Sequence, residues 1–139
     1  MKKFYSLFII GIVLFIAPTV SFSKNPTQIP VQIEVLYMNH GPMQPTLRKL
    51  RALFPEYGDK LTVSWYDFDT DKGERFKSKK GISHHVPLVI WVDGRSELKN
   101  KGRTIKFEGF PTGSGPSFFQ GKWKLKDLAG VLDQVTGKN

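Results

Sequence analysis

The 139-residue chain carries three histidines, His40, His84 and His85, and no cysteine. Because it has no thiol, it can form neither a disulfide nor a thiolate, and zinc–thiolate and iron–sulfur sites are excluded. The soft donors that remain are imidazole and thioether groups, and His40 lies one helical step before Met43. Imidazole and thioether ligands together suit copper, above all Cu(I). Copper binding is therefore one hypothesis that these residue types allow.

A nucleophile with an adjacent base is the second chemistry to consider, and Ser83 beside His84 is the nearest candidate. The two residues are neighbours in sequence, and no acid is visibly placed to orient the imidazole, so the pattern is not that of a catalytic triad. Histidine also titrates near neutral pH, so the three histidines are alternatively a pH-sensitive patch. The sequence thus disfavours a hydrolase.

The N-terminus has the pattern of a secretory signal peptide. A pair of lysines precedes an apolar run from Phe4 to Ala17, and Ser21 and Ser23 place small residues before a cleavage point. We expect residues 1–23 to be a signal peptide. The alternative is an uncleaved membrane anchor, since residues 4–23 are uncharged and just long enough to span a bilayer. Both interpretations predict a domain outside the cytoplasm, in the periplasm or the extracellular space.

The charge balance is basic, with 21 Lys and Arg against 12 Asp and Glu. Without the signal segment the chain keeps 19 basic and 12 acidic side chains, a net charge of +7. An exported protein rarely meets nucleic acid, and no base-stacking aromatic pattern accompanies the charge, so we expect no nucleic-acid partner. The charge favours an acidic protein partner or an anionic lipid surface. The basic residues gather in three segments, 48–51, 75–80 and 99–106.

Hydrophobic patterning predicts four strands and three helices in the order βαβαββα. The strands are expected at residues 31–37, 61–66, 87–92 and 104–110. The helices are expected from Met43 to Pro55, from Asp69 or Thr70 to Lys80, and over residues 125–135. Two crossovers make the first strands parallel, and a closing hairpin adds an antiparallel edge. The expected fold is therefore α/β, a four-stranded mixed sheet with helices on both faces.

The domain is expected to comprise residues 31–139, after a linker at residues 24–30 that contains two prolines. Within the domain, residues 111–123 are rich in Gly, Pro and Ser and are expected to form an insertion loop. This loop carries Phe118 and Phe119. The two aromatic side chains are either docking anchors for a partner or fold back to cover the sheet.

The turn after the first expected strand resembles the active-site turn of the thioredoxin superfamily. That family opens a helix with Trp-Cys-Gly-Pro-Cys, and this chain has Asn39-His40-Gly41-Pro42-Met43 at the same place. The further matches are the strand at residues 60–63, the Asp67-Phe68-Asp69 strand exit, and Gly81-Ile82 followed by Val86-Pro87, which resembles the segment with the family's cis-proline. The resemblance covers about residues 31–110 and implies a minimal thioredoxin-like fold.

The resemblance also implies a redox-inactive protein, because His40 and Met43 stand where the family has its two cysteines. Thiol–disulfide exchange requires a thiolate, so we expect no oxidoreductase activity. Glu34 occupies a strand position where the family often keeps a buried carboxylate. It is a relic, a partner for a lysine or an ordinary strand acid.

In the thioredoxin superfamily the cis-proline packs opposite the active-site turn, and the groove around it binds extended polypeptide. The resemblance therefore implies an accessory or interaction subunit of the cell envelope that uses such a groove and no cofactor. The expected partner-binding residues are His40, Gly41, Pro42, Met43, Val86, Pro87, Phe118 and Phe119. The alternative is a copper-binding protein whose ligands are His40, Met43, His84 and His85.

Overall fold

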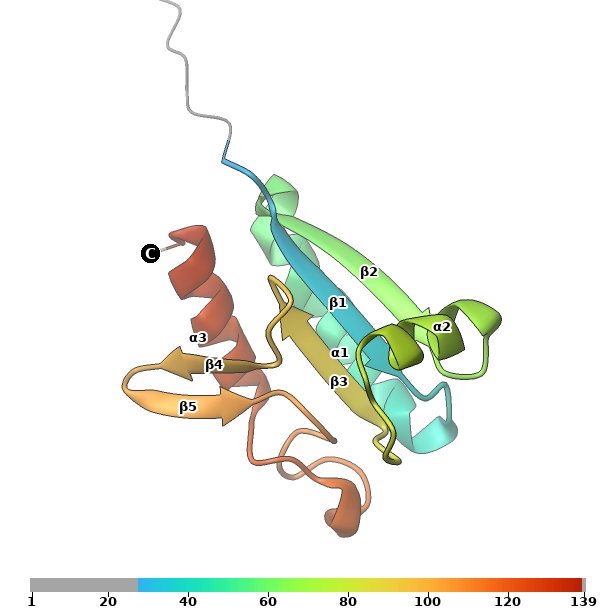
Figure 1. Ribbon diagram of the computed structural model, residues 1–139. Helices are drawn as coiled ribbons and strands as arrows, with labels where there is room; N and C mark the ends of the chain where they lie inside the picture. The colour runs from blue at the N-terminus through green and yellow to red at the C-terminus, as the bar shows by residue number, and fades with distance from the viewer. Residues whose placement is uncertain (1–27, 139) are drawn as a thin grey trace, which may run out of the picture.

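The computed structural model describes residues 28–138 (Figure 1). The expected signal or anchor segment, residues 1–23, and the first part of the expected linker lie outside the described residues. Residues 28–30 have no regular secondary structure. Between residues 28 and 138, no helix combines the length and the apolarity that a membrane crossing requires.

A three-stranded mixed sheet forms the centre of the fold. Its middle strand is β1 (Val31–Tyr37), which pairs in parallel with β2 (Leu61–Asp67) and antiparallel with β3 (Leu88–Val92). Strand β3 is buried along its whole length, as its unbroken apolar sequence predicts. Strand β2 lies at the edge of the sheet and is mostly half-buried.

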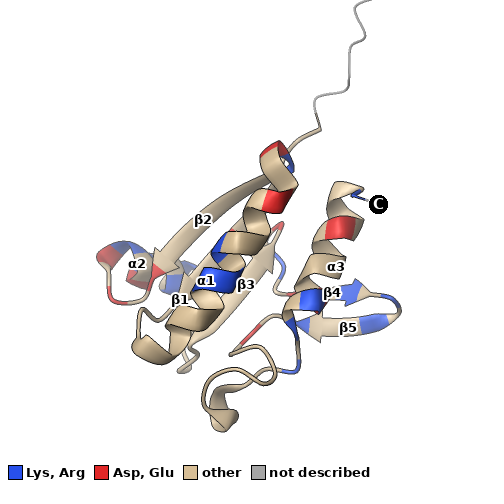
Figure 2. Ribbon diagram, turned by 180° about the vertical axis from the view of Figure 1, so that it is seen from behind, with Lys and Arg blue, Asp and Glu red and all other residues tan. Residues whose placement is uncertain are grey.

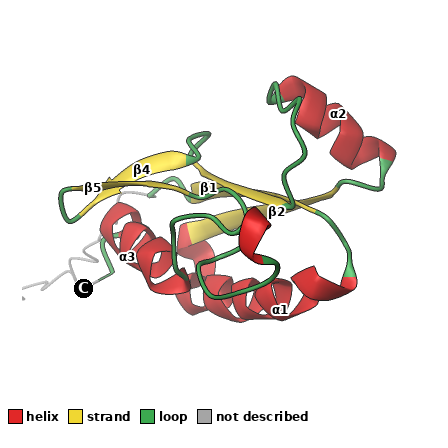
Figure 3. Ribbon diagram, turned by 90° about the horizontal axis from the view of Figure 1, so that it is seen from below, coloured by secondary structure: helices red, strands yellow, loops and turns green. Residues whose placement is uncertain are grey.

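Helices cover both faces of this sheet (Figure 3). Helices α1 (Gln44–Leu53) and α3 (Leu125–Thr136) pack on one face, and α2 (Asp71–Lys79) packs on the other. Helix α2 begins where the sequence predicts, because the Thr70 hydroxyl oxygen accepts a hydrogen bond of 3.1 Å from the Gly73 N–H. Three short 3-10 helices lie at Gly41–Met43, Phe54–Lys60 and Ser117–Phe119.

The expected sheet is wrong in two respects: the second crossover was expected to make the third strand parallel, but β3 is antiparallel to β1, and the sheet has three strands instead of four. The predicted strand at residues 104–110 is divided, and its first part is β5 (Arg103–Lys106), which pairs with β4 (Glu97–Asn100) in a separate hairpin. The chain then lies along β3 only briefly, where the Ile90 N–H donates a hydrogen bond of 3.0 Å to the Phe107 carbonyl oxygen. The order of elements is therefore βαβαβββα.

A tight turn explains this departure from the prediction. Lys101 and Gly102 have φ angles of 49° and 76°. Positive φ at both central residues is the conformation that closes a two-residue hairpin. Asn100 consequently pairs with Arg103 across the turn, and only residues 107–109 are left to lie beside β3.

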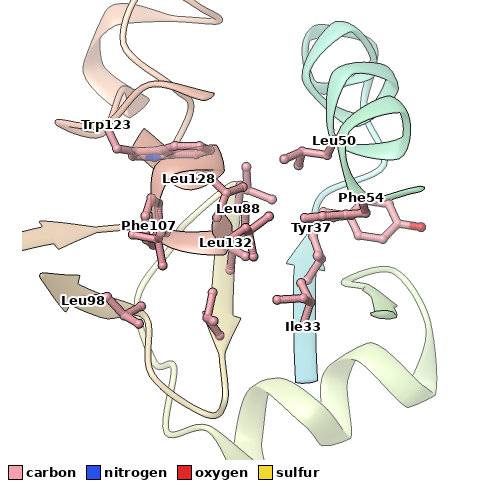
Figure 4. Close-up of a cluster of buried hydrophobic side chains, with 14 of the residues drawn as sticks. Ile33, Tyr37, Leu50, Phe54, Leu88, Leu98, Phe107, Trp123, Leu128 and Leu132 are labelled. Carbon is pink, nitrogen blue, oxygen red and sulfur yellow. The ribbon is translucent and has the colours of Figure 1, made fainter. Parts of the chain in front are cut away.

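Two clusters of buried apolar side chains hold the helices to the sheet. The larger cluster lies between β1, β3, α1 and α3, and includes Ile33, Leu50, Leu88, Leu128 and Leu132 (Figure 4). Trp123 packs edge-on against Phe107 with ring centroids 5.5 Å apart, and so fastens the start of α3 to the core. The smaller cluster lies under α2 and includes Leu36, Phe76, Val86, Val89 and Trp91.

Candidate binding surface

The turn at His40–Met43 follows β1 and leads directly into α1. It is a short 3-10 helix in which the Met43 N–H donates a hydrogen bond of 2.9 Å to the His40 carbonyl oxygen. Met43 is buried, whereas His40, Gly41 and Pro42 are exposed. Proline is well placed here, since the first turn of a helix has no partner for its N–H groups. The turn is thus anchored by Met43 and displays the three residues before it.

The segment at Val86–Pro87 lies beside this turn. The Met38 N–H donates a hydrogen bond of 2.9 Å to the Pro87 carbonyl oxygen, so the end of β1 and the start of β3 are bonded at this point. Val86 and Pro87 are both buried. The expectation of a cis peptide bond at Pro87 is wrong, because residues 28–138 contain trans peptide bonds alone. The pairing of β1 with β3 brings the segment to the turn with a trans proline.

The expected insertion, residues 111–123, folds back towards the same end of the sheet. The Phe110 N–H donates to the Phe119 carbonyl oxygen at 2.9 Å, and the Gly121 N–H donates to the Phe110 carbonyl oxygen at 2.7 Å. A Cβ atom on Gly109 would lie 2.5 Å from the Phe119 carbonyl oxygen, so this close approach requires glycine. Phe118 is 79% exposed, whereas Phe119 is half-buried. Of the two alternatives for this pair, Phe118 therefore projects and Phe119 turns inward.

Two adjoining depressions connect these three segments. The smaller has a volume of about 200 Å³ and is lined among others by His40, Pro42, Met43, His85, Pro87 and Phe119. The larger is an open groove of about 490 Å³, lined among others by His84, Val86, Lys106, Glu108, Phe118 and Lys122. His85, Pro87 and Phe119 line both. Seven of the eight expected partner-binding residues therefore line one continuous hollow, and Gly41 lies in the adjoining turn.

His84 and His85 have different surroundings although they are adjacent. The His84 Nε2 lies 2.5 Å from the Glu108 Oε1, and Lys106 also pairs with the Glu108 carboxylate. Burial alone would raise the pKa of Glu108, but the hydrogen bonds from Lys106 and His84 outweigh it and hold that pKa below its usual value. The ring centroids of His85 and Phe119 lie 5.2 Å apart. His84 thus belongs to an ion-pair cluster, and His85 belongs to the smaller cavity.

The expected copper ligands are brought together in part. His40, Met43 and His85 line the smaller cavity, and Met38 joins them there as a second thioether. His84 lines the larger groove instead. Within residues 28–138, no group of three or more His, Asp or Glu side chains is placed to hold a metal ion. Any metal site in this cavity would consequently depend on the two methionines.

Further residues line this hollow besides the expected partner-binding residues and copper ligands. Met38, Phe110 and Pro116 line the smaller cavity, and Lys106 and Glu108 line the larger groove. Met38 directly follows β1, and its N–H donates a hydrogen bond to the Pro87 carbonyl oxygen beside the turn. The approach of Pro116 and Phe119 depends on the path of a long loop, for which the sequence offers no periodic signal.

Glu34 lies on the face of the sheet that α2 covers, and its carboxylate pairs with the Lys80 ammonium group. Lys80 also lies over the rings of Phe76 and Trp91, at 5.2 and 5.0 Å from their centroids. Three roles were considered for Glu34, and the ion pair with Lys80 identifies it as a partner for a lysine. Its contacts are with α2, so Glu34 has a structural role in holding that helix.

Comparison of the chain with protein-family models, with curated proteins and with solved structures finds no match. The fold itself defines the class of protein as mixed α/β, with a three-stranded sheet, a separate hairpin and helices on both faces. The likeness to the thioredoxin superfamily stays a prediction from the sequence.

Proposed function

We propose that this protein is an exported, redox-inactive, thioredoxin-like domain that binds a partner protein in the cell envelope as an accessory subunit. It binds through the hollow formed by the His40–Met43 turn, the Val86–Pro87 segment and the Phe118–Phe119 loop. Because the chain contains no cysteine, thiol–disulfide exchange is chemically unavailable to it, and the proposed role is recognition.

The observation that carries the proposal is the convergence of these three segments on one hollow with an exposed aromatic residue at its rim. Phe118 is 79% exposed, and its ring centroid lies 4.4 Å from that of Phe119, which lines the smaller cavity. An exposed phenylalanine costs solvation free energy unless a partner covers it, and aromatic side chains in such positions are frequent binding anchors. The geometry favours an aliphatic or aromatic side chain of the partner in the smaller cavity.

The charges that line the larger groove are balanced, with Lys106 and Lys122 against Glu97 and Glu108. The expectation of an acidic partner therefore depends on the basic charge of the chain as a whole, with 21 Lys and Arg against 12 Asp and Glu. Electrostatic complementarity of this kind raises the rate of encounter with an acidic surface and weakens as salt screens it. We therefore expect capture of the partner to decrease with ionic strength.

Affinity capture from an envelope extract tests the proposal. The wild-type chain should retain a defined partner, and the double substitution Phe118→Ala with Phe119→Ala should lose it while the far-ultraviolet circular dichroism spectrum stays the same. Ile29→Ala is the matched control, because Ile29 is 85% exposed and lies before β1. Undiminished capture by the double variant would contradict the proposed surface.

A second candidate function, copper binding, is favoured by one observation. Two imidazoles and two thioethers, from Met38, His40, Met43 and His85, line the same small cavity. Titration with Cu(I) against a competing chelator tests it. The wild type should bind one equivalent, His40→Ala and His85→Ala should each weaken binding at least tenfold, and His84→Ala should have no effect. If the wild type binds Cu(I) no more strongly than the double variant His40→Ala with His85→Ala, copper binding is refuted.

A further inference from the structure

The outer edge of β2 presents backbone groups that no neighbouring strand satisfies. Tyr37 lies opposite Asp67, and its carbonyl oxygen accepts a hydrogen bond of 3.0 Å from the Phe68 N–H. In a parallel pair only alternate residues bond to a given neighbour, so the even-numbered residues of β2 face β1. The N–H and C=O groups that point outward are those of Leu61, Val63 and Trp65.

This edge lacks the features that normally protect a sheet edge. The part of the chain that the structure describes places no strand beside it, and Figures 1 and 2 show β2 at the outside of the sheet. From Leu61 to Tyr66 the strand contains no charged residue and no proline. Proteins usually guard an exposed edge with charges, proline or a bulge, because an unpaired edge is a template for another strand.

A groove of about 230 Å³ runs beside the same edge, lined by Phe54, Pro55, Gly58, Leu61, Val63, Trp65 and Arg51. The residues whose backbone groups point outward are therefore the ones whose side chains line this groove. A strand added to the edge would place every second side chain over the groove, since successive side chains point to opposite faces. The lining, apart from Arg51, favours apolar side chains at those positions.

The groove also carries an uncompensated positive charge. The Arg51 guanidinium lies over the Trp65 ring, 5.1 Å from its centroid. Among residues 28–138, no carboxylate lies within salt-bridge distance of Arg51. Arg48 lies one turn earlier on α1, and Figure 2 shows basic residues along that helix. The chemical complement of this end of the groove is a carboxylate.

We propose that the outer edge of β2 binds an extended segment of an acidic partner protein by strand addition. Backbone hydrogen bonds to Leu61, Val63 and Trp65 hold the segment, an apolar side chain occupies the groove, and a carboxylate pairs with Arg51. A second copy of this chain is the poorer occupant, because self-pairing would bring together two basic chains, each of net charge +7 without the signal segment. This surface is separate from the hollow at the His40–Met43 turn, so the two proposals stand independently.

Titration of the ¹⁵N-labelled full chain with a synthetic peptide tests the proposal by nuclear magnetic resonance. The probe is the capped peptide Thr-Val-Thr-Glu-Thr-Val-Thr, and its counterpart has Lys in place of Glu. The amide protons of Leu61, Val63 and Trp65 should move downfield as they become hydrogen-bonded, while those of Thr62, Ser64 and Tyr66 move much less. The Glu peptide should bind at least tenfold more tightly than the Lys peptide.

Two variants sharpen the test. Arg51→Glu should reverse the preference between the two peptides, which a merely structural change would not do. Val63→Pro removes one outward N–H and should abolish the alternating shifts, with Thr62→Ala as the control on the same strand. If Val63→Pro does not fold, the charge reversal at Arg51 decides alone.

Several outcomes would overturn this proposal without touching the proposed function. These are the absence of shifts in β2 at millimolar peptide, shifts confined to the His40–Met43 turn, or equal binding of the two peptides. Concentration-dependent shifts of the β2 amides without peptide would instead assign the edge to self-pairing. Each of these results is distinguishable from failure of the Phe118–Phe119 experiment, which reads a different surface.

Discussion

The backbone N–H of Met38 donates a hydrogen bond of 2.9 Å to the carbonyl oxygen of Pro87, although the two residues are 49 positions apart in the chain. The bond continues the antiparallel pairing of β1 with β3 beyond the last residue of β1. It fixes the start of the His40–Met43 turn against the segment that carries His85. The proposed binding surface therefore rests on the register of the central sheet.

Substitution of Met43 by alanine should destabilise the fold. Met43 is 1% exposed and belongs to the larger apolar cluster, so truncation leaves a cavity under the turn. We expect a loss of about 2–5 kcal/mol in the free energy of unfolding, measured by urea denaturation. His40→Ala, three residues earlier on the exposed side of the turn, should change it by less than about 0.5 kcal/mol. Equal effects of the two substitutions would show that Met43 does not anchor the turn.

The stability of the protein should fall in acid partly through Glu108. Because the pKa of Glu108 is lowered in the folded state, its ionised form contributes stability above the unfolded-state pKa of about 4.5. This contribution is lost as the pH falls through the lower folded-state value. Urea denaturation at pH 7 should therefore find Glu108→Gln less stable than wild type, and the difference should shrink below about pH 4. A difference that does not depend on pH would contradict this account.

Gly73→Ala should be strongly destabilising, although Gly73 lies within a helix where alanine is usually favoured. A Cβ atom at this position would lie 1.7 Å from the Asp67 carbonyl oxygen at the end of β2. Helix α2 would have to move away from the sheet, and we expect a loss of more than about 2 kcal/mol by thermal or urea denaturation. Ser78→Ala, exposed in the same helix, is the control and should be neutral or slightly stabilising. A neutral Gly73→Ala variant would mean that α2 does not pack this closely.

Tyr57 ties the 3-10 helix after α1 to helix α3. Its hydroxyl donates to the Asp133 carboxylate at 2.9 Å and to the Ala129 carbonyl oxygen at 3.1 Å. Burial first, and then the hydrogen bond to Asp133, raise the pKa of Tyr57 well above its usual value. Tyr57→Phe should cost about 1 kcal/mol of unfolding free energy at neutral pH. Because the folded-state pKa is raised, the advantage of tyrosine should be lost as the pH rises above about 10; an undiminished advantage there would refute the assignment.

The strands and helices around the turn were predictable because their signals are local. Apolar periodicity located β1, β2 and β3, and Thr70 identified the start of α2. The β4–β5 hairpin was not predicted, because β4 is a short polar strand with Leu98 as its one buried side chain. Its signal was the Lys101–Gly102 turn, whose local pairing competes successfully with the more distant pairing to β3.

The candidate site was predictable only as far as strand register determines it. The approach of His40 to Pro87 follows from the pairing of β1 with β3. The separation of His84 from His85 depends on Glu108, which lies beside β3 as expected, but its pairing with His84 has no signal in the sequence. The isomer of the bond before Pro87 also lay beyond a pattern-based prediction.

Site-specific photocrosslinking tests the central claim most directly. A photoreactive phenylalanine analogue is placed at position 118, and at position 126 as a control, since Lys126 is exposed on α3 away from the hollow. Irradiation in intact envelopes should crosslink position 118 to one defined protein, and the adduct should disappear when Phe119→Ala is introduced. Adducts from position 118 that are no more abundant or specific than those from position 126 would contradict the proposed surface.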